Sequence, residues 1–324
     1  MTSADQRGAR WLVAVGEPLI QLTPLPGQRL ADASDLRLGL GGAEANVVVA
    51  LARLGLPVSL LTRLGDDPFG RRIVRELQSS GVGTEAIRLD VGSPTGVYFK
   101  DFDGRRSTSH YYRAGSAAAS LDVDDLDRLP LETPWVHVTG VTSALSSTCS
   151  AVVDELLDQG DRDGAAVSFD VNFRPALWTD RDASEVLLRQ ARRAELVFVG
   201  RDEAHALWGT DTPDDVRSLM PDVPTVVVKD AARCAVSYCG AQRENVPALV
   251  VEVVEPVGAG DAFAAGYLAA RSEGRDERSA LRWGHLLGAR ATMGFADQGE
   301  VPPRWQLEQA ALLSADDWEG RGLD

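Results

Sequence analysis

A short glycine turn that leads into an apolar helix carries the strongest chemical signal in the sequence. The turn reads Gly258-Ala259-Gly260-Asp261, and the apolar pattern over 262–268 predicts a helix. Two glycines leave no side chain between the backbone and a ligand, and the amides at a helix N-terminus attract anions. The carboxylate of Asp261 either caps this helix or takes a proton from a hydroxyl that attacks phosphorus. The turn alone leaves both interpretations open.

The elements that must position this turn follow a regular alternation. Short apolar runs alternate with helical patterns, which predicts a mostly parallel sheet with helices on both faces and ligands beyond the carboxyl ends of its strands. The predicted strands lie at 11–15, 58–61, 135–138, 167–169, 196–199 and 225–228, and the predicted helices at 43–54, 69–78, 148–157, 183–192 and 213–219.

Two segments, 17–40 and 95–113, break the alternation. Their alternating, turn-rich sequence predicts a small β element that stands off the sheet. Such an element is either a lid over the site or a set of ordinary surface hairpins. The expected organisation is an α/β core over 11–300 with these two lid segments inserted, followed by one C-terminal helix and a frayed tail over 301–324.

The charge of the chain argues against two classes of partner. The 324 residues include 48 acidic and 33 basic side chains, which give a net charge of −15. A nucleic acid or an anionic membrane surface would favour a basic protein. If the substrate is an anion, arginines must gather at the site against the overall charge.

Cysteine and histidine usage indicates a cytoplasmic protein without a histidine-based metal site. Cys149, Cys234 and Cys239 form no disulfide framework, and the four histidines are scattered. Residues 1–10 are polar and have no apolar signal core. No run approaches the roughly 18 apolar residues that cross a bilayer, so no membrane partner is expected.

A second glycine segment, Gly39-Leu40-Gly41-Gly42-Ala43-Glu44-Ala45-Asn46, precedes another predicted helix. Paired glycines permit close approach of the backbone, and Glu44 and Asn46 can hydrogen-bond hydroxyls. A glycine turn before a capped helix is the plainer explanation of this segment alone.

Four segments, in the same order, resemble the ribokinase-like (PfkB) family of carbohydrate kinases. They are Gly41-Gly42-Ala43-Glu44-Ala45-Asn46, Leu51-Ala52-Arg53-Leu54-Gly55, Gly65-Asp66-Asp67-Pro68-Phe69-Gly70 and Gly258-Ala259-Gly260-Asp261-Ala262-Phe263. The resemblance runs from about residue 13 to residue 294 and implies a doubly wound, mostly parallel α/β core with a small β-sheet lid. It also implies transfer of the terminal phosphoryl group of ATP to a sugar hydroxyl, with Asp261 as the base and Gly258, Ala259 and Gly260 as the anion hole.

Two further stretches are similar to 2-keto-3-deoxygluconate kinases within that family. They are His110-Tyr111-Tyr112-Arg113-Ala114-Gly115-Ser116-Ala117-Ala118 and Phe169-Asp170-Val171-Asn172-Phe173-Arg174-Pro175-Ala176-Leu177-Trp178. Arg113 comes off the lid and Arg174 follows a core strand, and guanidinium groups pair bidentately with carboxylates and phosphates. The expected reaction is phosphorylation of 2-dehydro-3-deoxy-D-gluconate to its 6-phosphate.

The resemblance assigns binding roles to side chains in both halves of the site. The expected sugar-binding residues are Gly41, Gly42, Asn46, Tyr98, Tyr112, Arg113 and Arg174, and the expected nucleotide-binding residues are Asn172, Arg174, Lys229, Gly258 and Gly260. Alternatives stay open: the tyrosines can be lid packing, and Arg174 can simply pair with a carboxylate at a helix end.

The chain departs from the family pattern at three places. The family's Asn-x-x-Glu reads Gly200-Arg201-Asp202-Glu203, which leaves Glu203 to hold Mg²⁺ through water. The nucleotide segment Lys-x-Gly-x-x-Gly reads Lys229-Asp230-Ala231-Ala232-Arg233-Cys234, and Glu255-Pro256-Val257 replaces the more frequent Asp-Thr-Thr. By analogy, Asp297 is expected near the substrate.

Two other functions remain possible from the sequence. A fructokinase or ribokinase of the same family has less use for an arginine at the lid. A sugar-sensing protein without phosphotransfer would explain the altered nucleotide segment, although the intact glycine turn argues against it. The resemblance also implies a homo-oligomer, because exposed lid strands otherwise invite mispairing.

Overall fold

The computed structural model describes residues 11–102, 107–130, 133–163, 165–294 and 299–319. The strands are β1 (Leu12–Val15), β2 (Leu19–Pro24), β3 (Leu36–Gly41), β4 (Val58–Gly65), β5 (Ile87–Asp90), β6 (Val97–Phe102), β7 (Ser107–Tyr112), β8 (Trp135–Thr139), β9 (Ala166–Asp170), β10 (Leu196–Gly200), β11 (Thr225–Asp230), β12 (Cys234–Cys239) and β13 (Gln242–Pro247). The helices are α1 (Ala43–Arg53), α2 (Pro68–Ser79), α3 (Gly140–Leu145), α4 (Ser147–Asp163), α5 (Ala183–Ala191), α6 (Arg201–Trp208), α7 (Pro213–Leu219), α8 (Ala259–Ser272), α9 (Glu277–Thr292), α10 (Arg304–Leu312) and α11 (Ala315–Trp318).

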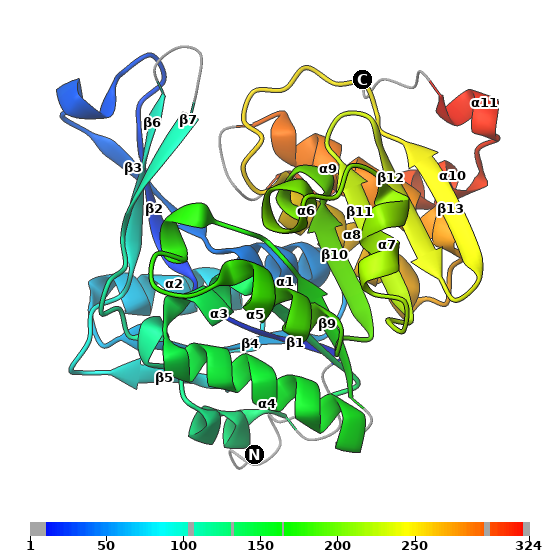
Figure 1. Ribbon diagram of the computed structural model, residues 1–324. Coiled ribbons are helices and arrows are strands. Elements are labelled where there is room, and N and C mark those ends of the chain that lie inside the picture. The colour runs from blue at the N-terminus through cyan, green and yellow to red at the C-terminus, as the bar shows by residue number, and fades with distance from the viewer. Residues whose placement is uncertain (1–10, 103–106, 131–132, 164, 295–298, 320–324) are drawn as a thin grey trace, which may run out of the picture.

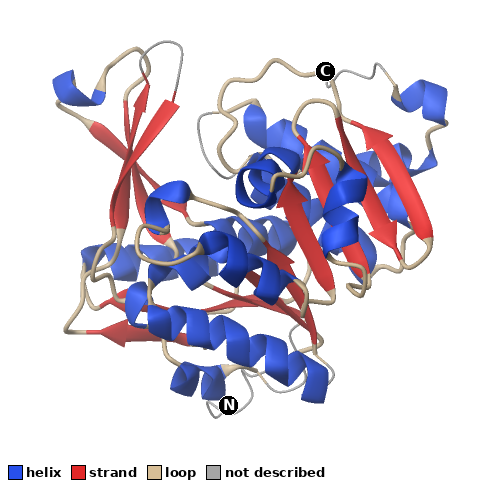
Figure 2. Cartoon of the chain, viewed as in Figure 1, coloured by secondary structure: helices blue, strands red, loops and turns tan. Residues whose placement is uncertain are grey.

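A nine-stranded sheet forms the centre of the described structure, with helices on both faces (Figures 1 and 2). Its order is β13-β12-β11-β10-β9-β8-β1-β4-β5, and only the pairs β11–β12 and β12–β13 are antiparallel. Side chains of β1 alternate between two cores: Leu12 and Ala14 pack with α1, α2, α8 and α9, whereas Val13 and Val15 pack with α4, α5, α6 and α7. Burial on both faces explains why the central strands are continuous apolar runs.

A second sheet stands away from the first, at the upper left of Figure 1. It has four strands in the order β3-β2-β6-β7, with β2 and β6 parallel and the outer pairs antiparallel. Its strands come from the two segments that break the sequence alternation. The expected fold class, a doubly wound α/β core with a small separate sheet, is confirmed.

Local side-chain chemistry starts several of the helices. Asp67 accepts a hydrogen bond from the Gly70 amide (2.8 Å), and Pro68 follows it at the first helical position of α2. Asp276 accepts one from the Ser279 amide (2.8 Å) and starts α9 in the same way. These carboxylates satisfy amides that have no partner within the helix.

The structure contains elements that the sequence patterns did not predict. The strands β5, β12 and β13 extend the sheet at its two edges, and α6 and α9 add helices. The polar sequence of β13, Gln-Arg-Glu-Asn-Val-Pro, gives little strand signal because this strand lies at the edge of the sheet.

The predicted frayed tail is wrong as far as residue 319. A second short helix, α11, follows α10, and Trp318 within it is 2% exposed. The indole Nε1 donates a hydrogen bond to the carbonyl of Pro247 (2.8 Å), at the end of β13. The last described residues are therefore packed against the edge of the main sheet.

Candidate active site

Asp261 lies in the first turn of α8 and is buried, with 9% of its surface exposed. Its Oδ2 accepts a hydrogen bond from Nδ2 of Asn46 (2.9 Å), and its Oδ1 accepts one from Nδ2 of Asn172 (3.2 Å). Both donors come from other segments, α1 and the loop after β9, so the carboxylate is held across the site. Within the described residues, Oδ1 of each asparagine is buried without a hydrogen-bond partner. Both oxygens can therefore accept a hydrogen bond from a hydroxyl.

The surroundings of Asp261 make its carboxylate a better base than an exposed aspartate. Burial raises the pKa of Asp261 above its usual 3.8. The hydrogen bond from Asn46 lowers it part of the way, the Asp170 carboxylate raises it, and the charges of Arg174 and Lys229 lower it. The net direction is upward. A raised pKa brings a general base closer to the pH at which it works.

The turn before α8 has a backbone suited to an anion. Gly258 is the N-cap residue and has φ of +87°, a left-handed conformation that favours glycine. The first amides of a helix have no partner within the helix, although that of Ala259 donates to the carbonyl of Pro256 just before it (3.3 Å). A Cβ added to Gly260 would lie 3.4 Å from Nζ of Lys229. A lysine ammonium therefore lies beside the predicted anion hole.

A carboxylate at the end of β9 holds this lysine. Nζ of Lys229 donates to Oδ2 of Asp170 (2.8 Å), and Oδ1 of Asp170 accepts the amide of Asn172 (3.2 Å). Burial by itself lowers the pKa of Lys229, but the carboxylates of Asp170 and Glu203 outweigh burial and raise it. The ammonium therefore stays charged. Asn172 has φ of +40°, an uncommon conformation for a residue with a side chain.

Gly41 and Gly42 lie where the small sheet meets α1. Gly42 has φ of +112°, and a Cβ there would lie 2.3 Å from the carbonyl oxygen of Glu17. A Cβ on Gly41 would lie 2.5 Å from Oη of Tyr98, whose ring is 2% exposed. Both glycines are therefore required sterically, and Tyr98 packs directly beneath the segment that the sequence assigns to sugar binding.

The tyrosines of the small sheet lie on opposite faces. Tyr98 of β6 stands opposite Tyr111 of β7, and their rings stack with centroids 5.2 Å apart. Tyr112 packs edge-on against Phe99, on the other face, and is 67% exposed. The structure therefore separates Tyr112 from the other residues expected to bind sugar and brings Tyr111 to Tyr98 instead. The period-two alternation of a strand was the signal that could have found this.

Arg113 lies just after β7 and is largely buried. Its guanidinium forms a salt bridge with the buried carboxylate of Glu17 and lies 5.2 Å from the centre of the Tyr111 ring. The other carboxylate oxygen of Glu17 accepts a hydrogen bond from Ser116 (2.6 Å). In the described part of the chain, Nε of Arg113 is buried without a hydrogen-bond partner. The arginine is thus fixed by the protein and still has a donor to offer.

Arg174 and Glu203 meet at the N-terminus of α6. Nη1 of Arg174 lies 3.4 Å from Oε1 of Glu203, and half of the arginine side chain is exposed. Oε2 of Glu203 accepts the amide of Gly200 (2.9 Å). Burial raises the pKa of Glu203, while the charge of Lys229 lowers it. The pairing of Arg174 with a carboxylate at a helix end, one of the two sequence interpretations, is present in this structure.

A single carboxylate, that of Glu203, is the side chain that the sequence assigns to Mg²⁺. Among the described residues, no three His, Cys, Asp or Glu side chains form a cluster that could hold a metal ion. Mg²⁺ usually keeps several waters and binds through one or two carboxylates together with substrate phosphates. A single carboxylate such as Glu203 fits that mode.

Three buried acidic residues have contacts that the sequence patterns did not assign. Asp170 is the last residue of β9 and holds Lys229, and Glu17 lies two residues after β1 and holds Arg113. Oε1 of Glu44, expected to bind hydroxyls, accepts hydrogen bonds from Thr139 (2.7 Å) and Thr142 (2.6 Å) of the protein itself. Burial raises the pKa of Glu44. A carboxylate directly after an apolar strand was the available signal for Asp170 and Glu17.

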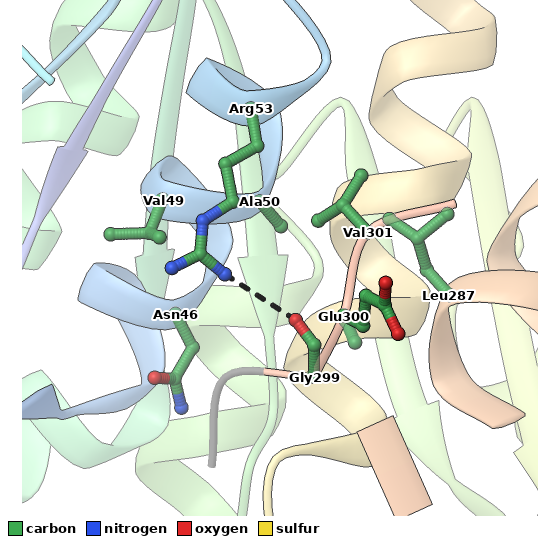
Figure 3. Close-up of a pocket in the computed structure, with 9 residues that line it drawn as sticks. Asn46, Val49, Ala50, Arg53, Leu287, Gly299, Glu300 and Val301 are labelled. Atoms are coloured by element: carbon green, nitrogen blue, oxygen red, sulfur yellow. Dashed lines mark hydrogen bonds between the residues drawn. The ribbon is translucent and has the colours of Figure 1, made fainter. Parts of the chain in front are cut away.

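A small pocket lies behind the candidate active site (Figure 3). It is lined by residues of α1, α8 and α9 and of segment 299–301, and Nη1 of Arg53 donates to the carbonyl of Gly299 across it (3.4 Å). Asn46 lines both this pocket and the site around Asp261. The predicted residue Asp297 lies outside the described residues. No helix in the described ranges is long and apolar enough to span a membrane.

Comparisons with known proteins show which family the chain belongs to. The model of the pfkB family of carbohydrate kinases matches residues 10–298. The 2-dehydro-3-deoxygluconokinase of Thermoproteus tenax is 36% identical over 319 residues, covering 94% of each chain. The 2-dehydro-3-deoxygalactonokinase of Haloferax volcanii is 30% identical, covering 90% of this chain and 94% of its own. A crystal structure of a fructokinase with bound ATP from Xylella fastidiosa superimposes with a TM-score of 0.83 at 26% identity, over 93% of this chain and 98% of that one.

The α/β core with a small separate sheet is a fold that this chain shares with a solved sugar kinase. The chain belongs to the pfkB family of carbohydrate kinases. It is therefore a phosphotransferase that acts on a sugar hydroxyl.

Proposed function

We propose that the protein transfers the terminal phosphoryl group of ATP to the terminal hydroxyl of 2-dehydro-3-deoxy-D-gluconate, giving the 6-phosphate. The observation that carries the proposal is the buried Asp261, held by Asn46 and Asn172 at the start of α8. The similarity to the Thermoproteus tenax kinase supports the choice of a keto acid. The fructokinase with bound ATP supports ATP as the phosphoryl donor.

Asp261 is the general base of this proposal. Its carboxylate accepts the proton of the sugar hydroxyl as the bond to phosphorus forms. The amides of Gly258, Ala259 and Gly260 stabilise the negative charge of the phosphoryl group in flight. The ammonium of Lys229, 3.4 Å from a Cβ position on Gly260, adds a fixed positive charge there.

Substrate binding is divided between the small sheet and the core. On the sugar side we propose Gly41, Gly42, Asn46, Tyr98, Tyr111, Arg113 and Arg174; on the nucleotide side, Asn172, Arg174, Lys229, Gly258 and Gly260. Tyr111 replaces Tyr112 because it shares a face with Tyr98. Glu203 would hold Mg²⁺ through water, and the ion would supply positive charge that neutralises phosphate oxygens. The small sheet acts as a lid that excludes water from the phosphoryl group.

An unused guanidinium donor at the lid favours an acid sugar over a neutral one. Arg113 is largely buried and has a donor left over. A substrate carboxylate forms a stronger, charge-assisted hydrogen bond with that donor than a neutral hydroxyl does. A fructokinase or ribokinase activity is the second candidate. The similarity to the Xylella fastidiosa fructokinase supports it.

A substrate panel tests the proposal. ADP release is measured with the purified protein, ATP, Mg²⁺ and each of 2-dehydro-3-deoxygluconate, its C4 epimer, fructose and ribose. Turnover with the keto acids above that with the neutral sugars is the expected result. Turnover of fructose or ribose alone would establish the second candidate, and sugar binding without any turnover would indicate a sugar sensor.

Asp261→Asn tests the catalytic role directly. General-base catalysis is worth about 10²- to 10⁴-fold in rate. The variant is expected to lose turnover by that order while its dissociation constant for the sugar acid changes little. Near-normal turnover would remove Asp261 from the mechanism.

We also propose that chains pair in the cytoplasm. All three cysteines are free thiols, as in a reducing compartment. Leu38 and Tyr112 are exposed apolar side chains of the small sheet that pairing would cover. Light scattering during gel filtration, together with cell fractionation, would test the assembly and the location.

A further inference from the structure

A buried ion pair links the small sheet to the turn before α8. Nζ of Lys100 on β6 lies 3.5 Å from Oε2 of Glu255, and the two side chains are 4% and 5% exposed. The residues are far apart in the sequence: Lys100 lies on the small sheet, and Glu255 lies in the loop between β13 and α8. Removing two charges from water is costly, and a pair of this kind contributes little net stability. The pair therefore calls for an explanation other than stability.

Glu255 organises the turn that leads to the anion hole. Its Oε1 accepts the backbone amide of Val257 (3.2 Å), and its own amide donates to the carbonyl of Thr292 on α9 (3.0 Å). The left-handed Gly258 follows directly. The position of the Glu255 carboxylate is thus coupled to the backbone that presents the amides of α8.

Lys100 shares a face of β6 with the tyrosine of the sugar side. Tyr98 and Lys100 are two residues apart and both buried, and the intervening Phe99 points to the other face, against Tyr112. Tyr98 lies beneath Gly41 and stacks on Tyr111. A shift of β6 that accommodates the sugar would therefore also move the ammonium that contacts Glu255.

We infer that Lys100 and Glu255 are positioning residues that couple sugar binding under the lid to the geometry of the phosphoryl-binding turn. The inference rests on the proposed function, in which the small sheet closes over the sugar and the α8 amides hold the phosphoryl group. When the lid is seated on a sugar, Lys100 fixes Glu255, and Glu255 fixes the turn. Each substrate then strengthens the binding of the other by the same factor.

The experiment measures this coupling by calorimetry. The dissociation constant of 2-dehydro-3-deoxygluconate is determined with and without a non-hydrolysable ATP analogue and Mg²⁺, and the converse pair of titrations checks reciprocity. Coupling between two sites is typically about 5- to 150-fold. We expect at least fivefold in the unchanged protein, and a factor near one in Lys100→Met and in Glu255→Gln.

The double variant Lys100→Met/Glu255→Gln keeps the experiment decisive if a single variant leaves an unpaired buried charge and fails to fold. It removes both charges and retains similar volumes. It is expected to bind each substrate alone about as tightly as the unchanged protein, to lose the coupling, and to hydrolyse ATP faster in the absence of sugar. If the pair were purely structural, the double variant would have a lower free energy of unfolding and would keep the coupling.

An ion pair made by the next residue of β6 provides the control. Nη2 of Arg29 lies 2.8 Å from Oδ2 of Asp101, a pair that links residues of the small-sheet segments only. Arg29→Met/Asp101→Asn should therefore keep the full coupling. Loss of coupling in the control, or retention in the double variant, would overturn the inference.

If the substrate panel shows that fructose or ribose is the sugar, the proposed substrate fails. The same titrations with that sugar still test the role of the ion pair.

Discussion

At the scale of single residues, the candidate site depends on how Asp261 is kept ionised yet basic. Burial raises the pKa of its carboxyl group, and the hydrogen bond from Asn46 lowers it. A base must be deprotonated to act, so activity is lost as the pH falls through this raised pKa. The acid limb of kcat/KM is therefore expected above the pH at which an exposed aspartate, with its usual pKa of 3.8, would titrate.

Removing a hydrogen bond to the ionised form should shift that limb predictably. Asn46→Ala removes a donor that lowers the pKa of Asp261, so the acid limb of kcat/KM should move to higher pH. Rate profiles against pH measure the shift. Asn245→Ala changes an exposed asparagine on β13 and should leave the limb in place. A shift of the limb to lower pH in Asn46→Ala would contradict the assignment of Asp261 as the titrating base.

The two adjacent tyrosines of β7 offer a matched pair of variants. Tyr111 stacks on Tyr98, whereas Tyr112 packs against Phe99 on the outer face. Tyr111→Ala should raise KM for the sugar acid about tenfold, the equivalent of about 1.4 kcal/mol. Tyr112→Ala should change KM less than about twofold. Steady-state kinetics with saturating ATP measures both, and the reverse order would show that the outer face binds sugar.

At the scale of elements, the turn between β11 and β12 contains an alanine in a left-handed conformation. Ala231 has φ of +43° and occupies a position where the resemblance leads one to expect glycine. A side chain in this conformation costs roughly 1–2 kcal/mol. Ala231→Gly should therefore raise the free energy of unfolding by about 1 kcal/mol, less the entropy cost of glycine. Urea denaturation measures the free energy of unfolding. Ala232 has a negative φ, so Ala232→Gly should not raise this free energy.

The elements near the site were the most predictable from sequence. The glycines, Asp261 and the central strands carry strong local signals, because buried strands must be apolar and tight turns need glycine. Lys229, Asp170 and Asn172 meet only because β9, β10 and β11 lie side by side, a contact that no local pattern contains. The strand β13 was missed because an edge strand can be polar. Tyr112 was assigned to the sugar side because the motif was transferred without applying strand alternation.

At the scale of the whole molecule, the short helix α11 packs against the edge of the main sheet at the end of β13. Trp318 is buried, its Nε1 bonds to the carbonyl of Pro247, and the guanidinium of Arg282 lies 5.1 Å from its ring centre. Trp318→Ala should lower the free energy of unfolding by about 3–5 kcal/mol. Chemical denaturation measures the loss. KM values should remain unchanged, because the side chain packs at the edge of the main sheet; a rise in KM without loss of stability would contradict this prediction.

The order of strands has a consequence for the way the chain emerges from the ribosome. From β8 to β13 every strand joins the flank of the strand made just before it, so this half of the sheet can grow stepwise during translation. Each step leaves one unpaired flank that could recruit another nascent chain. The last flank, that of β13, receives the indole of Trp318 about seventy residues later. At a synthesis rate of roughly 5–20 residues per second, several seconds pass between the synthesis of Pro247 and that of the indole that contacts its carbonyl.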